Sequence, residues 1–400
     1  MKPYLLLIAR IILLSFLFNL LIISSEAQQG VNVKNEQVID TSGFSDSAHH
    51  WYDIYDEDKL INYLSKRPKY KITEIEKIAD NILLFQKTNG GWPKNYDMLA
   101  ILTEEQKDTI NGARNLTNTT FDNGSTHFQI EYLAEAYSLT KIERFKDGCL
   151  KGIDFMLSAQ YPNGGWPQYY PDTNGYRRYI TFNDGAMIGV MKVLQKILAR
   201  KPQYSFVDTA RYGKVKEAFE KGIDCILKCQ IKQNGKLAVW GQQHDNIDFH
   251  PQNARAFEPA ALCGDESADI VLLLMSLDNP TQEVIAAIQS AVKWLHDSRI
   301  LGTRVNTISA PVVVYKYSTS AIDRVVVNDS NAPPIWTRFY ELGTNKPLFC
   351  NRDKIPVYSL AEVDRERRSG YTWYHYEPER VFNKYPKWQK KWAEDNNVVK

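Results

Sequence analysis

A short phrase that recurs at long intervals constrains the fold of this 400-residue chain more than any other feature. Asn-Gly-Gly-Trp-Pro stands at 89–93 and again at 163–167, and a weaker copy, Asn234-Gly235 followed by Trp240, completes the series. The spacing of roughly 70 residues is longer than that of the common solenoid repeats, yet recurrence at such a period still indicates repeated supersecondary units. The sequence therefore predicts one architecture built from equivalent pieces.

Each copy of the phrase follows an amphipathic run. Apolar residues recur with near-helical spacing at 75–85, 153–157 and 219–227. Asn-Gly is a natural left-handed helix stop, and after each stop a polar loop leads to the opening of a second helix. Three such helical hairpins predict a mainly α fold, an α/α toroid over residues 70–300.

The pattern changes from about Ile300 onward. β-branched runs at 312–315 and 325–327, together with helix-breaking prolines, predict short strands in a less regular region over 301–400. We expect this region to pack on the toroid and complete a cleft, with a final helix or two. Residues 28–69 form an N-terminal extension that contributes little to the prediction.

The first 27 residues match a secretory signal peptide. Lys2 precedes an apolar stretch from Tyr4 to Ile23, and Ser25-Glu26-Ala27 is a small-x-small cleavage site. The alternative is a retained membrane anchor, because the apolar run is long enough to span a bilayer. In either case we expect the rest of the chain to be exported, as a secreted, periplasmic or cell-surface protein.

Composition narrows the function. A formal net charge of +2 argues against a dedicated nucleic-acid binder. Nine Trp and 23 Tyr fit an apolar core and would also suit stacking on sugar rings. The five cysteines leave at least one thiol free, and their spacing indicates buried apolar residues rather than a disulfide framework or a metal site.

Carboxylates stand at equivalent places where the second helices open. In a toroid these loops gather at one end, so we expect Asp122, Asp184 and Glu258 to share a site. The alternative is that each caps a helix N-terminus. Asp122, Asn123 and Asp184 offer the carboxylate and amide oxygens that calcium prefers, and they leave coordination positions for water or substrate.

Arginines concentrate in the C-terminal third. Arg338 and Arg352 stand among Gly, Asn and aromatic residues, and a second group occupies 365–368. Guanidinium groups match carboxylates bidentately, although surface salt bridging is the preferred explanation of the 365–368 group as a whole. Calcium together with arginines would suit a polyanionic sugar acid.

Several ordered motifs resemble those of pectate lyases of polysaccharide lyase family ten. The resemblance covers roughly residues 70–390. It rests on the two Asn-Gly-Gly-Trp-Pro phrases and on the segments Thr120–Asn123, Thr181–Gly185, Val239–Asp245, Ala254–Pro259 and Arg338–Asn345.

The resemblance implies a toroid with a second region across a cleft, and anti-β-elimination on polygalacturonate. We also expect the protein to be a monomer. The resemblance implies that Asp122, Asn123 and Asp184 hold Ca²⁺. The arginine that abstracts the C5 proton falls on Arg352. The substrate carboxylates would be gripped by the guanidinium groups of Arg338, Arg367 and, at a place where the family has lysine, Arg299.

Two other functions fit parts of the pattern. A glycoside hydrolase on an α/α toroid would use two of Asp122, Asp184 and Glu258 as acid and base, but it does not need the arginines. A non-catalytic carbohydrate-binding protein would use the Trp loops as stacking platforms. We expect neither nucleic acid nor, after signal cleavage, a membrane as a partner.

Overall fold

The computed structural model describes residues 37–53 and 67–399. All the helices and strands discussed below belong to the unit Ile39–Lys400. The predicted signal peptide, residues 1–27, lies outside the described residues, as does part of the predicted extension, 28–69. Within the two described ranges, no helix combines the length and the hydrophobicity needed to cross a membrane.

The three amphipathic runs form helices, as predicted. They lie in α3 (Ile75–Phe85), α6 (Glu143–Ser158) and α8 (Thr209–Cys229), and each helix buries an apolar face. Each is followed by a polar loop and a second helix; these second helices are α5 (His127–Thr140), α7 (Ala186–Leu198) and α9 (Gly264–Met275). The predicted helical hairpins are therefore confirmed.

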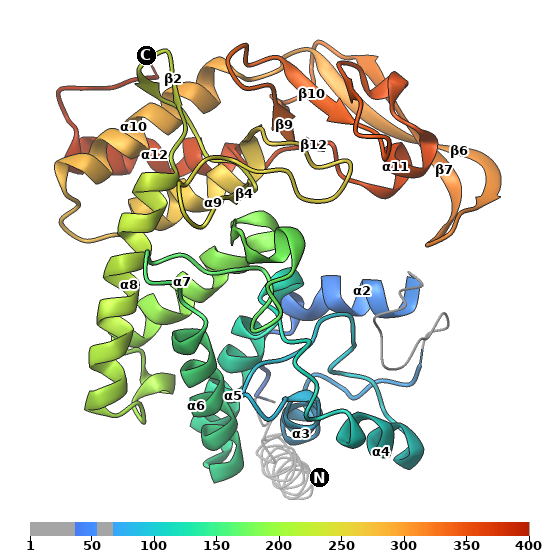
Figure 1. Ribbon diagram of the computed structural model, residues 1–400, viewed down its shortest axis with the longest axis vertical. Coiled ribbons are helices and arrows are strands. Elements are labelled where there is room, and N and C mark those ends of the chain that lie inside the picture. The colour runs from blue at the N-terminus through green and yellow to red at the C-terminus, as the bar shows by residue number, and fades with distance from the viewer. Residues whose placement is uncertain (1–36, 54–66, 400) are drawn as a thin grey trace, which may run out of the picture. The chain divides into compact units, whose positions relative to one another are not determined.

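The hairpins stand side by side in two layers (Figure 1). Helices α3, α6 and α8 are successive neighbours in one layer, and α5, α7 and α9 are successive neighbours in the other. A fourth pair extends the layers within the described residues: α10 (Gln282–Asp297) packs beside α8, and α12 (Glu379–Trp392) packs beside α9. The fold is thus of the α/α toroid type, with one more helix pair than the sequence predicts.

A buried tryptophan fastens each loop to the helix before it. The indole N–H donates to a backbone carbonyl in the last turns of that helix at 2.7 or 2.8 Å, in the pairs Trp92–Ile82, Trp166–Met156, Trp240–Ile226 and Trp336–Leu295. All four side chains are fully buried. They therefore cannot serve as the stacking platforms that the carbohydrate-binding alternative requires.

A glutamine at the end of α3, α6 and α8 ties neighbouring helices together. The side-chain amide of Gln86 donates to the carbonyls of Gly90, in its own loop, and of Gly148, in α6, both at 2.9 Å. The same double contact recurs from Gln160 to Gly164 and Ala218, and from Gln230 to Ala238 and Ala287. These bonds satisfy buried carbonyls at equivalent places in successive hairpins.

The Asn-Gly pairs lie beyond the helix ends, which corrects their predicted role as helix stops. Helix α6 ends at Ser158, whereas Gly164 lies in the turn that follows, with φ of 92°; Gly90 has φ of 94°. A Cβ on Gly164 would lie 2.0 Å from the carbonyl oxygen of Lys221 in α8. Glycine is required here because the loop crosses the backbone of the next helix.

Small sheets join residues 298–378 to the third hairpin. Strand β5 (Leu262–Cys263), directly before α9, pairs with β9 (Phe339–Tyr340). The sheet continues in the order β11-β10-β9-β5, with β10 at Pro347–Cys350 and β11 at Pro356–Val357. Strand β8 (Trp336–Thr337) pairs separately with β12 (Tyr374–His375).

One β-hairpin in this region has longer strands than the short ones that the sequence predicts. It consists of β6 (Thr303–Val314) and β7 (Thr319–Asn328), which contain the two β-branched runs, and it lies beside α11 (Arg365–Gly370) (Figure 1). The remaining helices and strands are α2 (Ser45–Asp53), α4 (Glu104–Gly112), β1 (Ile180–Thr181), β2 (Lys232–Gln233), β3 (Lys236–Leu237) and β4 (Gln243–His244).

The described part of the N-terminal extension packs on the toroid. Phe44 and Trp51 are buried, and the Ser47 hydroxyl donates to the Tyr96 carbonyl at 2.9 Å. Helix α2 also lies against the turn η2 (Asp122–Gly124). The extension therefore contributes to the core, which the sequence pattern does not indicate.

All five cysteines are free and buried, which agrees with the absence of a disulfide framework in the sequence. Burial raises the pKa of the Cys149 thiol well above its ordinary value. A buried neutral thiol acts as a small apolar side chain.

Two glycine substitutions test the crossing of loop and helix. Gly164 and Gly235 both have positive φ, 92° and 76°, but only at Gly164 would a Cβ meet another backbone; at Gly235 nothing lies within 4 Å. We expect Gly235→Ala to lower the free energy of unfolding by roughly 1 kcal/mol. Gly164→Ala should lower it by roughly 3 kcal/mol or more, because overpacking adds to the backbone strain. Urea unfolding followed by circular dichroism measures both, and equal losses would contradict the crossing.

Candidate active site

The residue two positions after each anchoring tryptophan reaches one polar centre. These residues are Lys94, Gln168, Gln242 and Arg338. Lys94 Nζ and Gln168 Nε2 contact the Asp122 carboxylate at 2.5 and 2.9 Å. Gln242 Nε2 and Arg338 Nη2 both donate to Asn183 Oδ1, at 2.7 and 3.0 Å. Equivalent loops of the hairpins therefore meet at one end of the layers.

Asp122 and Asp184 stand on turns of the same shape. They lie in η2 and in η4 (Asn183–Gly185), where Asn123 and Asp184 have φ of 52° and 49°. Asn and Asp tolerate this left-handed conformation better than other side chains. Neither aspartate caps the helix that follows, because the N-cap residues of α5 and α7 are Thr126 and Gly185. The helix-cap explanation of these two carboxylates is therefore excluded.

The pKa values of the two carboxylates are shifted in opposite directions in the free protein. Burial disfavours ionisation of Asp122, but the charge and hydrogen bond of Lys94 outweigh it and hold the pKa of Asp122 below its ordinary value. Burial of Asp184, reinforced by the charge of Asp122, raises the pKa of Asp184 to about 7. The Asp184 side chain nevertheless remains 30% exposed, so a ligand can reach it.

The electrostatics of this pair suit a cation. A second negative charge near Asp122 is unfavourable unless a positive ligand compensates it. Asp122 and Asp184 offer carboxylate oxygens, and no other described side chain is hydrogen-bonded to the amide of Asn123 beside them. Three hard oxygen donors on rigid turns fit the coordination chemistry of calcium.

Glu258, the third predicted carboxylate, is the partner of an arginine. It accepts from Arg255 Nε at 2.8 Å and from the Tyr371 hydroxyl at 3.0 Å. Burial opposes its charge, but Arg255 holds the pKa of Glu258 below its ordinary value. Its charge reaches Asp184, so it belongs to the same centre. Its charge is already compensated by the bidentate contact with Arg255.

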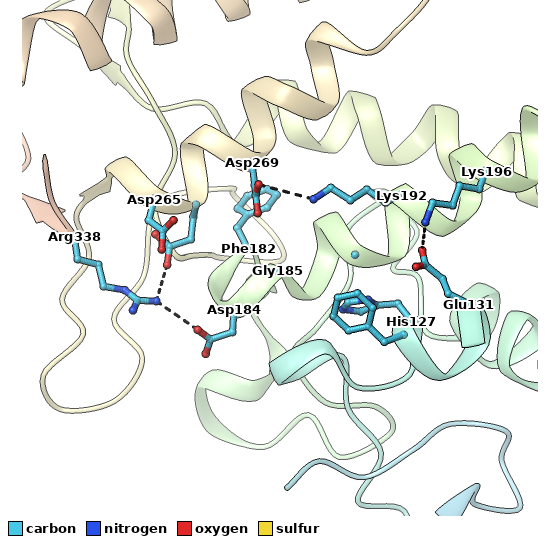
Figure 2. A pocket seen from close by; sticks show the side chains of 13 residues that line it. His127, Glu131, Phe182, Asp184, Gly185, Lys192, Lys196, Asp265, Asp269 and Arg338 are labelled. Carbon is cyan, nitrogen blue, oxygen red and sulfur yellow. Dashed lines mark hydrogen bonds and ion pairs between the residues drawn. The ribbon is translucent and has the colours of Figure 1, made fainter. Parts of the chain in front are cut away.

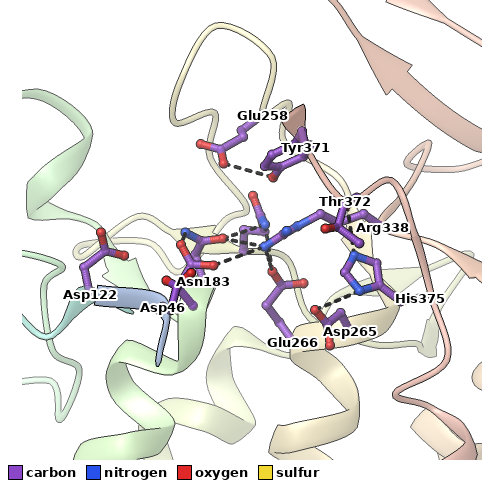
Figure 3. A network of polar contacts seen from close by, with 12 residues as sticks. Asp46, Asp122, Asn183, Glu258, Asp265, Glu266, Arg338, Tyr371, Thr372 and His375 are labelled. Carbon is purple, nitrogen blue, oxygen red and sulfur yellow. Dashed lines mark hydrogen bonds and ion pairs between the residues drawn. The ribbon is translucent and has the colours of Figure 1, made fainter. Parts of the chain in front are cut away.

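Arg338 spans the centre (Figure 3). Its Nη2 donates to Glu266 Oε1 at 2.9 Å and lies 3.5 Å from Asp184 Oδ1, and its guanidinium stacks on the Tyr371 ring at 4.7 Å from the centroid. The side chain is only 8% exposed. Arg338, which the sequence predicts to bind a substrate carboxylate, therefore lies next to Asp184, on the side facing α9.

Arg352 and Arg367 share one carboxylate farther from the aspartates. Arg352 binds Glu366 bidentately with two contacts of 2.9 Å, and Arg367 Nε donates to the same group at 2.8 Å. Both guanidinium groups lie against the Phe257 ring, 5.2 and 4.8 Å from its centroid. Arg255 lies 5.1 Å from the same centroid, so the three arginines form one cationic cluster.

Arg299 is not brought to this cluster. It follows α10 and turns back onto His296, donating from Nε to the carbonyl at 2.8 Å and contacting Nε2 of the ring at 2.6 Å. Its predicted contact with substrate therefore receives no support from the geometry and stays a prediction.

A cavity of about 370 Å³ opens beside Asp184 (Figure 2). Arg338 and Asp265 stand at the Asp184 end of its lining. Two ion pairs, Lys192–Asp269 at 3.8 Å and Lys196–Glu131 at 2.8 Å, lie farther along it. The cavity is bounded by α5, α7 and α9, the layer that carries the acidic turns.

A second set of possible metal ligands lies near Arg338. One ligand atom from each of Asp265, His375 and Glu377 lies within 4.8 Å of the other two. His375 Nδ1 is 3.2 Å from Asp265 and 3.3 Å from Glu377, and these two carboxylates raise the pKa of His375 against the effect of burial. A protonated histidine between two carboxylates needs no metal, and its nitrogen is a poor ligand for calcium.

The sequence interpretation did not single out Arg255 or Lys94. Arg255 lies within the Ala254–Pro259 motif, three residues before Glu258, and Lys94 follows the first Trp-Pro phrase directly. Aligning the residue two positions after each tryptophan would have found Lys94, because Gln168 and Gln242 occupy the equivalent places. Arg255 has no such equivalent.

Comparison with known proteins agrees with this architecture. The family model described as pectic acid lyase matches residues 86–382. The structure is similar to the family 10 polysaccharide lyase from Cellvibrio cellulosa, with 30% identity, a TM-score of 0.66, and coverage of 78% of this chain and 92% of that one.

The same values hold for an aspartate-to-alanine mutant of that enzyme in complex with trigalacturonic acid. No curated protein sequence matches the chain. The family model and the structural match each extend over most of the toroid and its C-terminal region. The chain is therefore a pectate lyase that belongs to the pectic acid lyases and, among the polysaccharide lyases, to family 10.

Proposed function

We propose that this enzyme cleaves polygalacturonate by calcium-assisted β-elimination and acts outside the cytoplasm. One observation carries the proposal: two carboxylates whose negative charges disfavour each other, Asp122 and Asp184, stand on adjacent turns with Lys94 and Arg338 beside them. Such a centre would suit a cation together with the carboxylate of a sugar acid. The trigalacturonic acid bound to the Cellvibrio mutant supports the substrate class.

The cation would be held by Asp122, Asp184 and Asn123. When bound there, calcium neutralises the uronate carboxylate, acidifies the adjacent C5 proton and favours loss of a proton from nearby guanidinium groups. In the elimination, a base removes the C5 proton, the electron pair forms the C4–C5 double bond, and the C4 oxygen leaves with the rest of the chain. The new end is a 4,5-unsaturated galacturonate.

Arg255 is better placed than Arg352 to act as the base. The charge of Arg255 acts on Asp122, Asp184 and Lys94, so its guanidinium lies among the proposed cation ligands. Its side chain is 42% exposed, which leaves it accessible to a ligand. Arg352 is likewise bound bidentately, by Glu366, but its charge is not among the main influences on Asp122 or Asp184. The sequence-based assignment of Arg352 stays a rival prediction.

The pKa of Arg255 sets a condition on this role. Burial disfavours the charged guanidinium, but Glu258 outweighs burial and holds the pKa of Arg255 well above its ordinary value. In the free enzyme Arg255 is therefore protonated. It can act as a base only in the loaded site, and we infer that the rate rises into the alkaline range.

Arg338, Arg352 and Arg367 are proposed to bind substrate carboxylates. All three are already oriented by carboxylates of the chain, Glu266 or Glu366, and by aromatic rings. Such support fixes a guanidinium before substrate arrives, which lowers the entropy cost of binding. Membership of a lyase family leaves the glycoside hydrolase alternative without support.

Export and a monomeric state complete the proposal. Export rests on the signal-peptide pattern of residues 1–27, which lie outside the described residues. Free buried cysteines do not conflict with it, because the chain has no exposed thiol among its five cysteines.

The elimination predicts a chromophore that depends on a cation. With polygalacturonate, we expect ultraviolet absorbance from a 4,5-unsaturated uronide to rise with the enzyme and to stop when a chelator is added. Asp184→Ala should lower the rate at least roughly 100-fold, because it removes a cation ligand. Calcium titration by calorimetry should show weaker binding to this variant than to the parent.

Asp108→Ala, on the exposed face of α4, is the matched control and should keep full activity and affinity. New reducing ends without the chromophore would show hydrolysis instead of elimination. Full activity in excess chelator would contradict the calcium role.

Two arginine-to-lysine variants distinguish the rival bases. Arg255→Lys should lower turnover by roughly 10³-fold while oligogalacturonate binding changes little, because proton abstraction contributes mainly to the transition state. Arg352→Lys should weaken binding and keep turnover within about tenfold of the parent. Single-turnover rates and calorimetric affinities across pH measure both effects. The reverse pattern would assign the base to Arg352, as the sequence predicts.

A further inference from the structure

A second cavity lies beside Lys94, the ion-pair partner of Asp122. It has a volume of about 310 Å³ and opens between the loops that follow α3 and α6. Its lining includes Pro93, Lys94, Asn118, Tyr169, Asp172 and Arg177. Lys94 belongs both to this lining and to the centre, since its ammonium contacts the Asp122 carboxylate at 2.5 Å. The cavity therefore adjoins the proposed site of elimination.

Two cations in this cavity are held against one aromatic ring. The Arg177 guanidinium lies 4.4 Å from the Tyr169 ring centroid, and Lys94 Nζ lies 5.6 Å from it. Asp172 binds Arg177 Nη1 at 2.5 Å, which fixes the guanidinium on the ring. Cation–π contacts and this ion pair orient both positive groups before any ligand binds.

The charges of the two cavities beside the aspartates differ in sign. The cavity next to Asp184 is lined by five carboxylates and three cationic side chains; its histidine, His127, is neutral because burial lowers the pKa to about 3. The cavity next to Lys94 carries two cationic side chains and one carboxylate, that of Asp172. A polyanionic chain leaving the centre is therefore favoured in the second cavity and repelled by the first.

We propose that the cavity at Lys94, Tyr169 and Arg177 is a subsite for an additional galacturonate unit of the substrate. This subsite proposal rests on the proposed function and extends it. Lys94 and Arg177 bind the carboxylate of that unit, and Tyr169 and Asp172 orient the two cations. The volume is at the lower end of the range for small-molecule sites and suits one sugar acid.

The subsite predicts that Arg177 matters only for substrates long enough to reach it. Arg177→Ala should lower kcat/KM on hexagalacturonate about 10- to 100-fold, the effect of losing one charge-assisted contact. On the shortest cleaved oligomer the change should stay within about threefold. Arg177→Lys should restore part of the loss, because the charge remains without the planar fork.

Arg178→Ala is the matched control. Arg178 is the next residue of the same turn, Gly175–Arg178, but it lies over Tyr179, 5.0 Å from the ring centroid, and does not line the cavity. It should keep the parent's dependence on chain length. Melting temperatures of all variants verify that the loop still folds.

Two outcomes would overturn the subsite: an equal loss by Arg177→Ala on every chain length, or no loss on any. Calorimetric binding of oligogalacturonates of increasing length separates this result from failure of the proposed function. If the parent binds the oligomers without eliminating them, the proposed function fails. The subsite then stands or falls on whether Arg177→Ala removes the gain in affinity with length.

Discussion

The hydrogen bond from a buried indole to the helix before it is the interaction on which the arrangement of this protein depends. A buried N–H without a partner costs about 1–3 kcal/mol. Each indole N–H therefore has to bond to the one carbonyl that its loop can reach. Because the loop is fixed at the tryptophan, the residue two positions later is fixed as well. The residues fixed in this way are Lys94, Gln168, Gln242 and Arg338. All four contact Asp122 or Asn183 in the acidic turns.

Repetition explains which parts of the site could be predicted from the sequence. Asp122 and Asp184 lie one position apart in equivalent turns, η2 and η4, of equivalent hairpins. A toroid brings such turns together without any knowledge of side-chain contacts. Glu258 follows the same rule but contacts Arg255, three residues earlier, and this pairing is a matter of local chain direction that spacing does not reveal. The arginines do not recur at equivalent positions of the hairpins, so Arg299 could be assigned only by resemblance. In the structure Arg299 turns toward His296.

The fourth helix pair shows where a repeat becomes invisible to sequence analysis. Trp336 bonds to α10 as the other tryptophans bond to their helices, yet no Asn-Gly precedes it. Residues 298–335 replace the short turn with the β6–β7 hairpin and a bridge between Ile300 and Ile335. Its second helix, α12, comes only after a further set of strands. The period of roughly 70 residues is lost, although the contacts that define the unit remain. Arg338 belongs to this hidden repeat, which explains why an arginine from the C-terminal region reaches turns of the second hairpin.

The distribution of charge follows from the same scaffold. Buried carboxylates in close proximity destabilise a fold unless partners compensate them, and removing one partner leaves an uncompensated charge. Here Lys94 compensates Asp122 and Glu266 shares Arg338 with Asp184, whose pKa is raised to about 7. Compensation is therefore incomplete at Asp184, which also lines the cavity. A flexible loop would relieve that strain by moving Asp184 into water, but η4 is held between Gln242, which bonds Asn183, and helix α7. The tryptophan anchors thus keep the Asp184 carboxylate where its negative charge is unfavourable. A cation bound together with a polyanionic ligand would be stabilised by this charge.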